Sequence, residues 1–200
     1  MTKNRYKHTQ GLTITPYNSK EKLKVNFSDT YLKQVFLKIA IEGTLHKIYF
    51  DKKINNNIEF ISFIKQKQHS VFFVKAGKEE VGFFWLAKFN QRSAFMNYCF
   101  FKSFWGKKSL TISRFCIEYI LERKNENGDY MLDILLGLTP INNRLAVNFL
   151  IKSGMQVLGK IPGICTDYHQ NKVVDGLLSY KTRNTSKMAG SSIFYPHSIS

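Results

Sequence analysis

The sequence has few of the residues that cross-link small secreted domains or bind structural metals. Its 200 residues include three cysteines and five histidines. Cys99, Cys116 and Cys165 are odd in number and widely spaced, and neither they nor the histidines match the spacing of a zinc site. We therefore expect no disulfide framework and no metal, and we expect reduced thiols in a cytoplasmic compartment.

Long apolar runs are also missing. No stretch approaches the roughly 18 uninterrupted apolar residues typical of a membrane-spanning helix. The N-terminal sequence MTKNRYKHTQ has no apolar segment behind its basic residues, so no signal peptide is expected. A hydrophobic content of 44% is enough for a large core and excludes a mainly disordered chain. We expect one domain over residues 23–183, a tail or edge segment over 1–22 and a flexible tail over 184–200.

Acidic residues are scarce, with 14 Asp and Glu against 30 Lys and Arg, which gives a formal net charge of +16. Two interpretations remain open. Lysine outnumbers arginine 24 to 6, and such a bias fits AT-rich coding with a solvated basic surface. The other interpretation is a negatively charged partner: nucleic acid, a phosphate-bearing cofactor or an acidic protein. Because the lysines are dispersed and do not alternate with aromatics on one strand, we do not expect nucleic-acid binding.

The first half of the chain shows alternating strand and helix patterns. Residues 23–27 alternate apolar and polar side chains, as a strand does. Ser28 then offers a helix N-cap, and Gly43 ends the helix. The asparagines at 55–57 can cap a second, short helix. Strands are then predicted at 71–74, 81–87 and 94–101, which form an antiparallel meander.

A loop over residues 102–108 follows the meander and contains Gly106. Behind it, residues at helical spacing predict an amphipathic helix over 110–123. Its apolar face consists of Ile112, Phe115, Cys116, Tyr119 and Ile120. The stretch 130–138 is almost continuously apolar, which is typical of a strand buried on both faces. Thr139 and Pro140 are expected to turn the chain.

Asn142 or Asn143 is predicted to cap the next helix, and Gly154 ends it. Leu145, Ala146, Phe149 and Leu150 form its apolar face. The last two strands are predicted at 155–158 and 177–180, joined by a loop with proline and glycine. The resulting order, β-α-α-β-β-β-α-β-α-β-β, predicts an α/β (α+β) fold. Its central sheet is mixed and mainly antiparallel, with helices on both faces.

One segment has the layout of a phosphate site. Residues 101–110, FKSFWGKKSL, place a glycine-containing loop between a strand and a helix. The N–H groups of a first helical turn have no partner within the helix, and the helix dipole favours an anion there. Lys107 and Lys108 add positive charge at this point. A plain helix start with two solvated lysines is the other interpretation.

Three segments resemble the GNAT (GCN5-related N-acetyltransferase) family. Residues 104–110, FWGKKSL, are similar to its acetyl-CoA loop. Residues 143–155, NRLAVNFLIKSGM, match its N-x-x-A-x-x-(L/F)-Y-x-K-x-G-F segment at Asn, Ala, Phe, Lys and Gly. Residues 159–163 and 175–180, GKIPG and DGLLSY, resemble its last hairpin. The resemblance covers roughly residues 23–182 and implies an acyl-CoA N-acyltransferase-like fold.

The resemblance also implies an activity, the transfer of an acetyl group from acetyl-CoA to an amine. The amine is not identified and belongs to a small molecule or a protein. The implied acetyl-CoA contacts are Cys99, Phe100, Phe101, Trp105, Gly106, Lys107, Lys108, Ser109, Leu110, Asn143 and Leu150.

The loop departs from the family pattern Q/R-x-x-G-x-G/A. Trp105 stands at the Q/R position, Lys108 at the first glycine and Leu110 at the small residue. Leu150 stands where many members have a tyrosine that protonates the leaving thiolate. These changes keep open an alternative, a catalytically silent member that acts as a binding or assembly module.

The strand at 94–101 has no carboxylate, although many members carry a glutamate base there. Tyr98 and Cys99 are therefore the candidate catalytic side chains. By resemblance, the backbone N–H of Cys99 or Phe100 polarises the thioester carbonyl, and much of the rate can come from such polarisation and from positioning.

Overall fold

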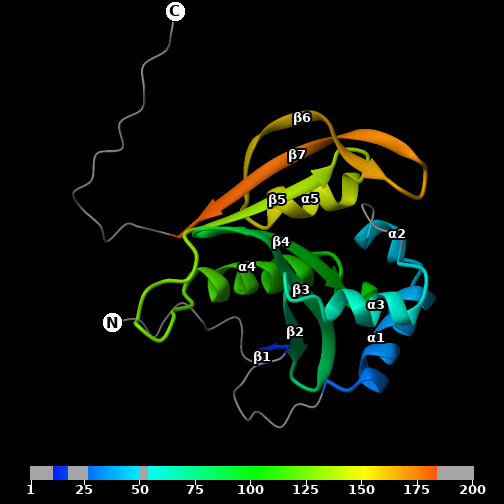
Figure 1. The fold of residues 1–200 in the computed structure, drawn as a ribbon, viewed down its shortest axis with the longest axis horizontal. Coiled ribbons are helices and arrows are strands. Elements are labelled where there is room, and N and C mark those ends of the chain that lie inside the picture. The colour runs from blue at the N-terminus through cyan, green and yellow to red at the C-terminus, as the bar shows by residue number, and fades with distance from the viewer. Residues whose placement is uncertain (1–10, 18–26, 50–53, 184–200) are drawn as a thin grey trace, which may run out of the picture.

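The structure is a computed structural model that describes residues 11–17, 27–49 and 54–183. Within these ranges, helices cover both faces of a seven-stranded sheet (Figure 1). The strands are β1 (Leu12–Pro16), β2 (Ser70–Ala76), β3 (Glu79–Asn90), β4 (Ser93–Phe100), β5 (Ile134–Pro140), β6 (Gln156–Asp167) and β7 (Lys172–Thr182). The helices are α1 (Asp29–Ile41), α2 (Leu45–Ile48), α3 (Asn57–Ile64), α4 (Lys107–Leu121) and α5 (Arg144–Lys152), with a 3-10 turn, η1, at Lys102–Phe104.

The sheet has the order β1-β2-β3-β4-β5-β7-β6. β4 and β5 run parallel, and the other neighbouring pairs are antiparallel. The parallel pair requires a crossover, which α4 supplies. The prediction of a mixed, mainly antiparallel sheet with helices on both faces is therefore confirmed.

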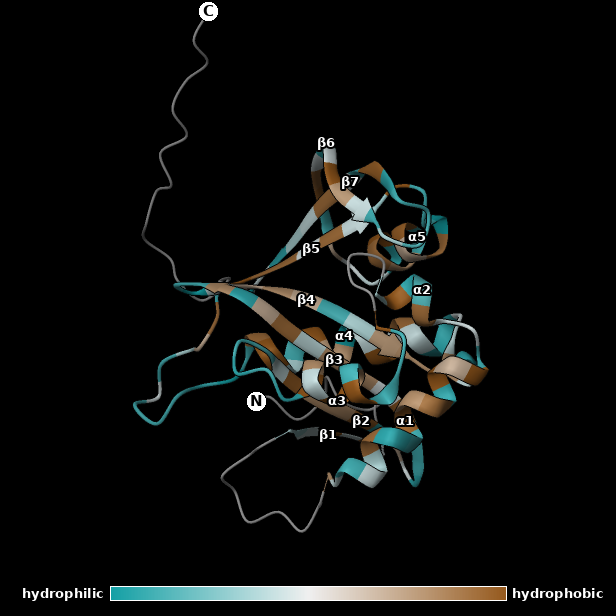
Figure 2. Cartoon of the chain, turned by 45° about the vertical axis from the view of Figure 1, so that its right-hand side comes forward, coloured by the Kyte–Doolittle hydropathy of each residue, from teal (hydrophilic) through white to brown (hydrophobic). Residues whose placement is uncertain are grey.

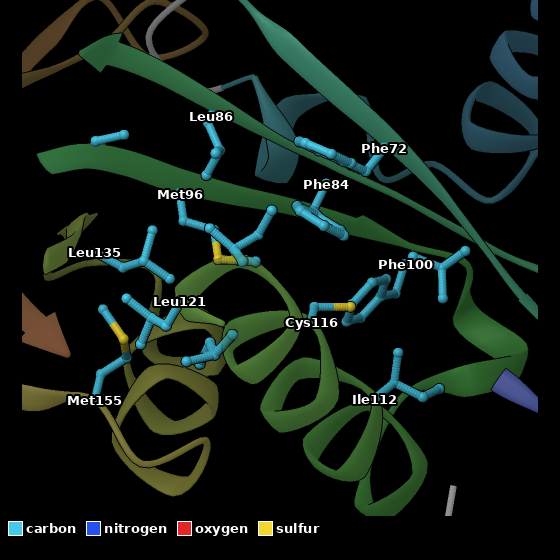
Figure 3. Packing of buried hydrophobic residues seen from close by; sticks show 14 of the residues in the cluster. Phe72, Phe84, Leu86, Met96, Phe100, Ile112, Cys116, Leu121, Leu135 and Met155 are labelled. Atoms are coloured by element: carbon cyan, nitrogen blue, oxygen red, sulfur yellow. The ribbon is translucent and has the colours of Figure 1, made fainter. Parts of the chain in front are cut away.

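Two hydrophobic cores lie on opposite faces of the sheet. Successive side chains of a strand point to opposite faces, so Phe100 belongs to the core against α4 and α5, and Cys99 to the core against α1 and α3. Figure 3 shows the first core, where Ile112 and Cys116 of α4 face the strands. β4 is thus packed on both sides.

Helix α4 begins three residues earlier than its periodicity predicts. The prediction was 110–123, and the helix covers Lys107–Leu121. Gly106 precedes the first turn with a φ of +80°, which glycine adopts without strain. Lys107 and Lys108, which were expected in the loop, therefore belong to the first helical turn.

The strand predicted over 130–138 begins later, because β5 covers Ile134–Pro140 and includes the expected turn. It is also not buried on both faces, since Leu135 is fully buried while Ile134 is exposed. No described residue of β5 belongs to the core against α1 and α3. Those helices cover the β2–β4 part of the sheet, and β5 packs on one face only.

The last two strands are longer than predicted. β6 covers Gln156–Asp167 and β7 covers Lys172–Thr182, so the expected connecting loop around Pro162 is itself part of the hairpin. The ladder shifts register twice, once between Ile161 and Cys165. Such irregularities accommodate a proline, because an unpaired residue needs no ladder hydrogen bond.

The strand predicted over 23–27 falls outside the described residues, as does the segment 184–200. Within the segment 1–22, expected as a tail or an edge segment, β1 pairs antiparallel with β2 at one edge of the sheet. Among the helices of the described ranges, none has both the length and the apolar character needed to cross a membrane.

Candidate functional site

β4 and β5 form a fork. They pair only between residues 93–95 and 134–136, and beyond these residues the two strands diverge (Figure 2). The N–H of Phe101 donates to a carbonyl of β3 at 2.8 Å. Because backbone groups along a strand point alternately to its two sides, Tyr98 and Phe100 direct their N–H and C=O groups away from β3. The open end of the fork therefore presents an unpaired strand edge.

The closed end of the fork is held by charged side chains. Asp133 accepts hydrogen bonds from Arg92 and, at 2.8 Å, from Arg183. The guanidinium carbon of Arg183 also lies 3.6 Å from the centroid of the Tyr130 ring. The hydrogen bond from Arg92 is the main cause that lowers the pKa of Asp133.

Two adjoining cavities occupy the open end. The larger, of about 470 Å³, lies between the end of β4, the N-terminus of α4 and α5. The smaller, of about 120 Å³, lies in the fork between residues 96–98 and 137–140. Both are lined by Lys47, Ile48, Tyr98, Asn143, Ala146 and Phe149.

The N-terminus of α4 faces the larger cavity. Gly106, Lys107, Ser109 and Leu110 line it. No side chain caps the first turn, and the hydroxyl of Ser109 donates to the carbonyl of Gly106 at 2.8 Å. The first N–H groups of α4 therefore remain available to an anion. The ammonium of Lys108 lies 5.6 Å from the centroid of the Phe104 ring, and Lys108 does not line the cavity.

Trp105 forms part of the wall of the larger cavity. Its indole N–H donates to the carbonyl of Phe100 at 2.7 Å. The ammonium of Lys47 lies 5.8 Å from the centroid of the indole ring. The side-chain amide of Asn143 lies 3.5 Å from the Lys47 carbonyl. Contacts from α2 and α5 thus meet at the mouth of the cavity.

The structure brings together most of the residues that the sequence singled out. The larger cavity is lined by Tyr98, Phe100, Trp105, Gly106, Lys107, Ser109, Leu110 and Asn143, and the smaller one by Tyr98, Asn143 and Leu150. Cys99, Phe101 and Lys108 line neither cavity. Cys99 and Phe101 point to the opposite face of the sheet from Tyr98 and Phe100, and both are buried there. Burial also raises the pKa of the Cys99 thiol.

The alternation along β4 distinguishes the two candidate backbone donors. Cys99 pairs with Phe83, and its N–H faces β3. The N–H of Phe100 faces the open side of the fork. Of the two amides considered from the sequence, the one on Phe100 is therefore placed to meet a ligand in the larger cavity.

Sequence reasoning missed many of the lining residues, among them Lys47, Ile48, Trp85 and Asn97. Lys47 and Ile48 lie on α2, a four-residue helix with no side-chain cap and no periodic signal. Trp85 and Asn97 are cross-strand partners of β3 and β4 and line the smaller cavity. Side chains alternate between the two faces of a strand, so the sequence could have placed Trp85 and Asn97 on the face of the sheet opposite to the Tyr98 side chain.

The cavities carry positive charge. Among the described residues that line them, the ionisable side chains are three lysines and one tyrosine, namely Lys47, Lys107, Lys152 and Tyr98, with no carboxylate or histidine. Desolvation raises the pKa of Tyr98 well above its ordinary value. Its hydroxyl lies 3.2 Å from the sulfur of Met96. The lining suits an anionic ligand.

The strand order, the fork and the helix that starts at its open end define the acyl-CoA N-acyltransferase fold of the GNAT family. A solved acetyltransferase from Salmonella typhimurium that modifies the N-terminal serine of ribosomal protein L7/L12 is similar to this chain, with a TM-score of 0.67 and 10% identity over 88% of this chain and 96% of the other.

Two further solved structures share the fold. Spermidine N-acetyltransferase from Vibrio cholerae, in complex with CoA and spermine, has a TM-score of 0.61 and 16% identity over 86% of this chain and 96% of the other. The microcin C7 self-immunity acetyltransferase MccE, in complex with acetyl-CoA and AMP, has a TM-score of 0.61 and 15% identity over 78% and 89%. No protein-family model matches the sequence, and no curated protein matches it.

Proposed function

We propose that this protein is an acyl-CoA-dependent N-acyltransferase that transfers an acetyl group from acetyl-CoA to an amine. The observation that carries the proposal is the open end of the fork. There the unpaired edge of β4 and the uncapped N-terminus of α4 line one cavity of about 470 Å³. CoA combines a pyrophosphate with an arm that contains amides, so the two features suit two parts of one molecule.

The residues present fit this ligand. The free N–H groups of the first turn of α4 suit the pyrophosphate, and Lys107 and Lys152 add opposite charge from two sides of the cavity. The outward-facing N–H groups of Tyr98 and Phe100 and the C=O of Tyr98 suit the amides of the arm, which can add to β4 as a further strand would, while the C=O of Phe100 accepts from the Trp105 indole in the free protein. The structural neighbours bound to CoA or acetyl-CoA support this assignment.

The reaction forms a C–N bond and breaks a C–S bond, so one proton leaves the amine and the CoA thiolate takes one up. The N–H of Phe100 is directed to polarise the thioester carbonyl. Tyr98 lines both cavities, and its raised pKa keeps it protonated at neutral pH. Its hydroxyl, which donates to the sulfur of Met96 at 3.2 Å in the free protein, would have to exchange that acceptor for the departing sulfur.

The acceptor amine reaches the fork from the side of Trp85 and Asn97, which line the smaller cavity on the face opposite α4. Among the described lining residues, none is a carboxylate or a histidine that could take its proton. The amine therefore loses its proton to solvent before it attacks, and the rate depends on positioning more than on a dedicated base.

A catalytically silent binding or assembly protein is the second candidate. The observation that favours it is the hydrogen bond from Trp105 to the carbonyl of Phe100, which occupies a group on the unpaired edge. Leu150 also supplies no proton to the smaller cavity, although it lines that cavity at the position of the family's tyrosine.

Calorimetric titration with acetyl-CoA and CoA, followed by a thiol-release assay, separates these candidates. The amines to test are a polyamine, a peptide with a free N-terminus and a set of amino acids. We expect binding of acetyl-CoA and thiol release that depends on one class of amine. Binding without release from any amine supports the silent protein. No binding at millimolar concentration contradicts the proposed function.

A further inference from the structure

The hydrogen bond of Trp105 is placed where a ligand amide is needed. Phe100 is the last residue of β4, and its C=O lies on the strand edge that β5 leaves unpaired. The indole N–H of Trp105 donates to this oxygen at 2.7 Å. Both residues line the larger cavity. The chain thus satisfies, with its own side chain, an acceptor that faces the proposed ligand.

An amide-bearing ligand that adds to the edge of β4 competes for the same oxygen. Strand addition uses the N–H and C=O groups of the edge. A buried carbonyl left without a donor is costly, so one donor replaces the other. The indole N–H and a pantetheine N–H are equivalent donors to Phe100, and an exchange between them conserves the hydrogen bond.

The indole is held loosely in its place. Its residue is 38% exposed, in contrast to Trp85, which is 5% exposed. The ammonium of Lys47 lies 5.8 Å from the ring centroid, at the outer limit of a cation–π contact. Gly106 follows directly with a φ of +80°, a region open to glycine without strain. The ring can therefore leave the edge without disturbing either core.

We propose that the Trp105 indole is a displaceable plug on the β4 edge, which the amide-bearing arm of CoA replaces at the Phe100 carbonyl. The proposal rests on the proposed function, because it assumes that CoA enters the larger cavity. It makes Trp105 a residue that sets CoA affinity, and it explains how a chain with a tryptophan at this position can still bind the cofactor.

The test combines Trp105 fluorescence with CoA affinity. The signal of Trp105 is the difference between the wild type and Trp105→Phe, because the chain has two tryptophans. With saturating CoA we expect this difference signal to shift to longer wavelength and to become more accessible to acrylamide. Trp105→Phe keeps a ring but removes the N–H, so the Kd for CoA falls about fivefold, which is ~1 kcal/mol.

Tyr168→Phe is the matched control. It also removes one donor from an exposed aromatic ring, and Tyr168 lines neither cavity. We expect it to leave CoA affinity unchanged. A gain of affinity in this control equal to that of Trp105→Phe contradicts a specific role for the indole.

The remaining outcomes distinguish the plug from the proposed function. CoA binding by Trp105→Phe alone, with none by the wild type, overturns a displaceable plug, because the arm of CoA then does not replace the indole in the natural sequence. CoA binding by the wild type, with an unchanged Trp105 signal and no gain in Trp105→Phe, overturns the plug and leaves the proposed function intact. Failure of both proteins to bind CoA overturns both proposals.

Discussion

The two ends of the β4–β5 pair are built from opposite kinds of contact. At the closed end, three residue pairs of the parallel ladder are followed by an ion-pair cluster in which Asp133 binds Arg92 and Arg183. At the open end, the ladder stops, and the space is lined by apolar side chains, lysines and unpaired backbone groups. One end is closed by ion pairs, and the other end opens into the two cavities.

The difference shows how a sheet can open locally while each of the two strands stays paired along its other edge. β4 remains paired with β3 over nearly its whole length, and β5 remains paired with β7. Only the seam between β4 and β5 is interrupted, and the buried cores lie against α4 and against α1 and α3 on either side. The edge of β4 beyond residue 95 is therefore unpaired by β5, while β4 is held by β3 and β5 is held by β7.

The largest expected effect concerns pH. The closed end holds the carboxylate of Asp133, whereas the described lining of the open end has no carboxylate or histidine. Under the proposed function the acceptor amine loses its proton to solvent, so we expect kcat/KM to rise about tenfold per pH unit up to the pKa of the amine. A pH–rate profile checks this. A plateau above about pH 7, with an apparent pKa near 6.5, indicates a side-chain base and contradicts the account.

The second-largest effect is expected from a substitution that fills the cavities at the open end of the fork. Ala146 is half-buried and lines both cavities, so Ala146→Trp puts an indole into the space shared by them. We expect CoA affinity to fall about thirtyfold, which is ~2 kcal/mol. Calorimetry measures the affinity and thermal unfolding the stability. Ile151→Trp is the control, because Ile151 is exposed on the same helix and lines neither cavity. Equal losses in the two variants argue against a ligand in the fork.

The two lysines of the first turn of α4, Lys107 and Lys108, should contribute differently to CoA affinity. Lys107 lines the larger cavity, while the ammonium of Lys108 lies over the Phe104 ring. Lys107→Glu puts a negative charge beside the pyrophosphate, and we expect CoA affinity to fall about tenfold. Lys108→Glu serves as the control, with an expected loss of less than about twofold because salt screens the more distant charge. The reverse ranking contradicts this position of the pyrophosphate.

The smallest effect is expected at the closed end and concerns stability alone. Asp133→Asn keeps the shape of the side chain but removes the charge that Arg183 and Arg92 share. We expect unfolding in denaturant at pH 7 to require on the order of 1 kcal/mol less. CoA affinity stays unchanged. Glu126→Gln, a change at an exposed residue, is the matched control.

The pH dependence of that effect has a definite sign. The hydrogen bond from Arg92 lowers the pKa of Asp133 in the folded state. The stabilisation is therefore complete above the ordinary carboxyl pKa of about 3.9 and is lost as the pH falls through the lowered folded-state value. Wild type and Asp133→Asn should converge in strongly acidic solution. A stability difference that grows toward acid pH is inconsistent with this ion pair.

Much of the fold could be predicted because its signals are local. Ser28 accepts a hydrogen bond from the N–H of Tyr31 and caps α1, and Asn56 caps α3 through the N–H groups of Ile58 and Glu59, as their sequence positions indicate. Asn143 caps α5 by accepting from the N–H of Ala146. These contacts join residues two or three positions apart, and a sequence displays them directly.

The elements that sequence reasoning missed depend on distant contacts. The long β6–β7 hairpin passes through Pro162 with register shifts that only pairing with β7 defines. The face of α5 was also partly wrong, because Leu145 is 60% exposed beside the larger cavity.

The residues of the site also fall into two groups, those that can be located from local sequence and those that depend on tertiary packing. The loop residues at 105–110 could be located from their order in the chain. The outward position of Lys108 and the bond from Trp105 to Phe100 depend on tertiary packing. The Cys99 side chain lies outside the cavities because side chains alternate along β4, and this alternation can be predicted from the sequence.

Amide hydrogen exchange of β4, followed by NMR with and without acetyl-CoA, tests the central claim most directly. In the free protein we expect the N–H groups of Tyr98 and Phe100 to exchange fast and those of residues 93–95 to be better protected. Saturating acetyl-CoA should slow exchange at Tyr98 and Phe100 and change residues 93–95 little. Binding of acetyl-CoA, shown by calorimetry, without any protection of Tyr98 and Phe100 contradicts the claim that the open end of the fork holds the cofactor.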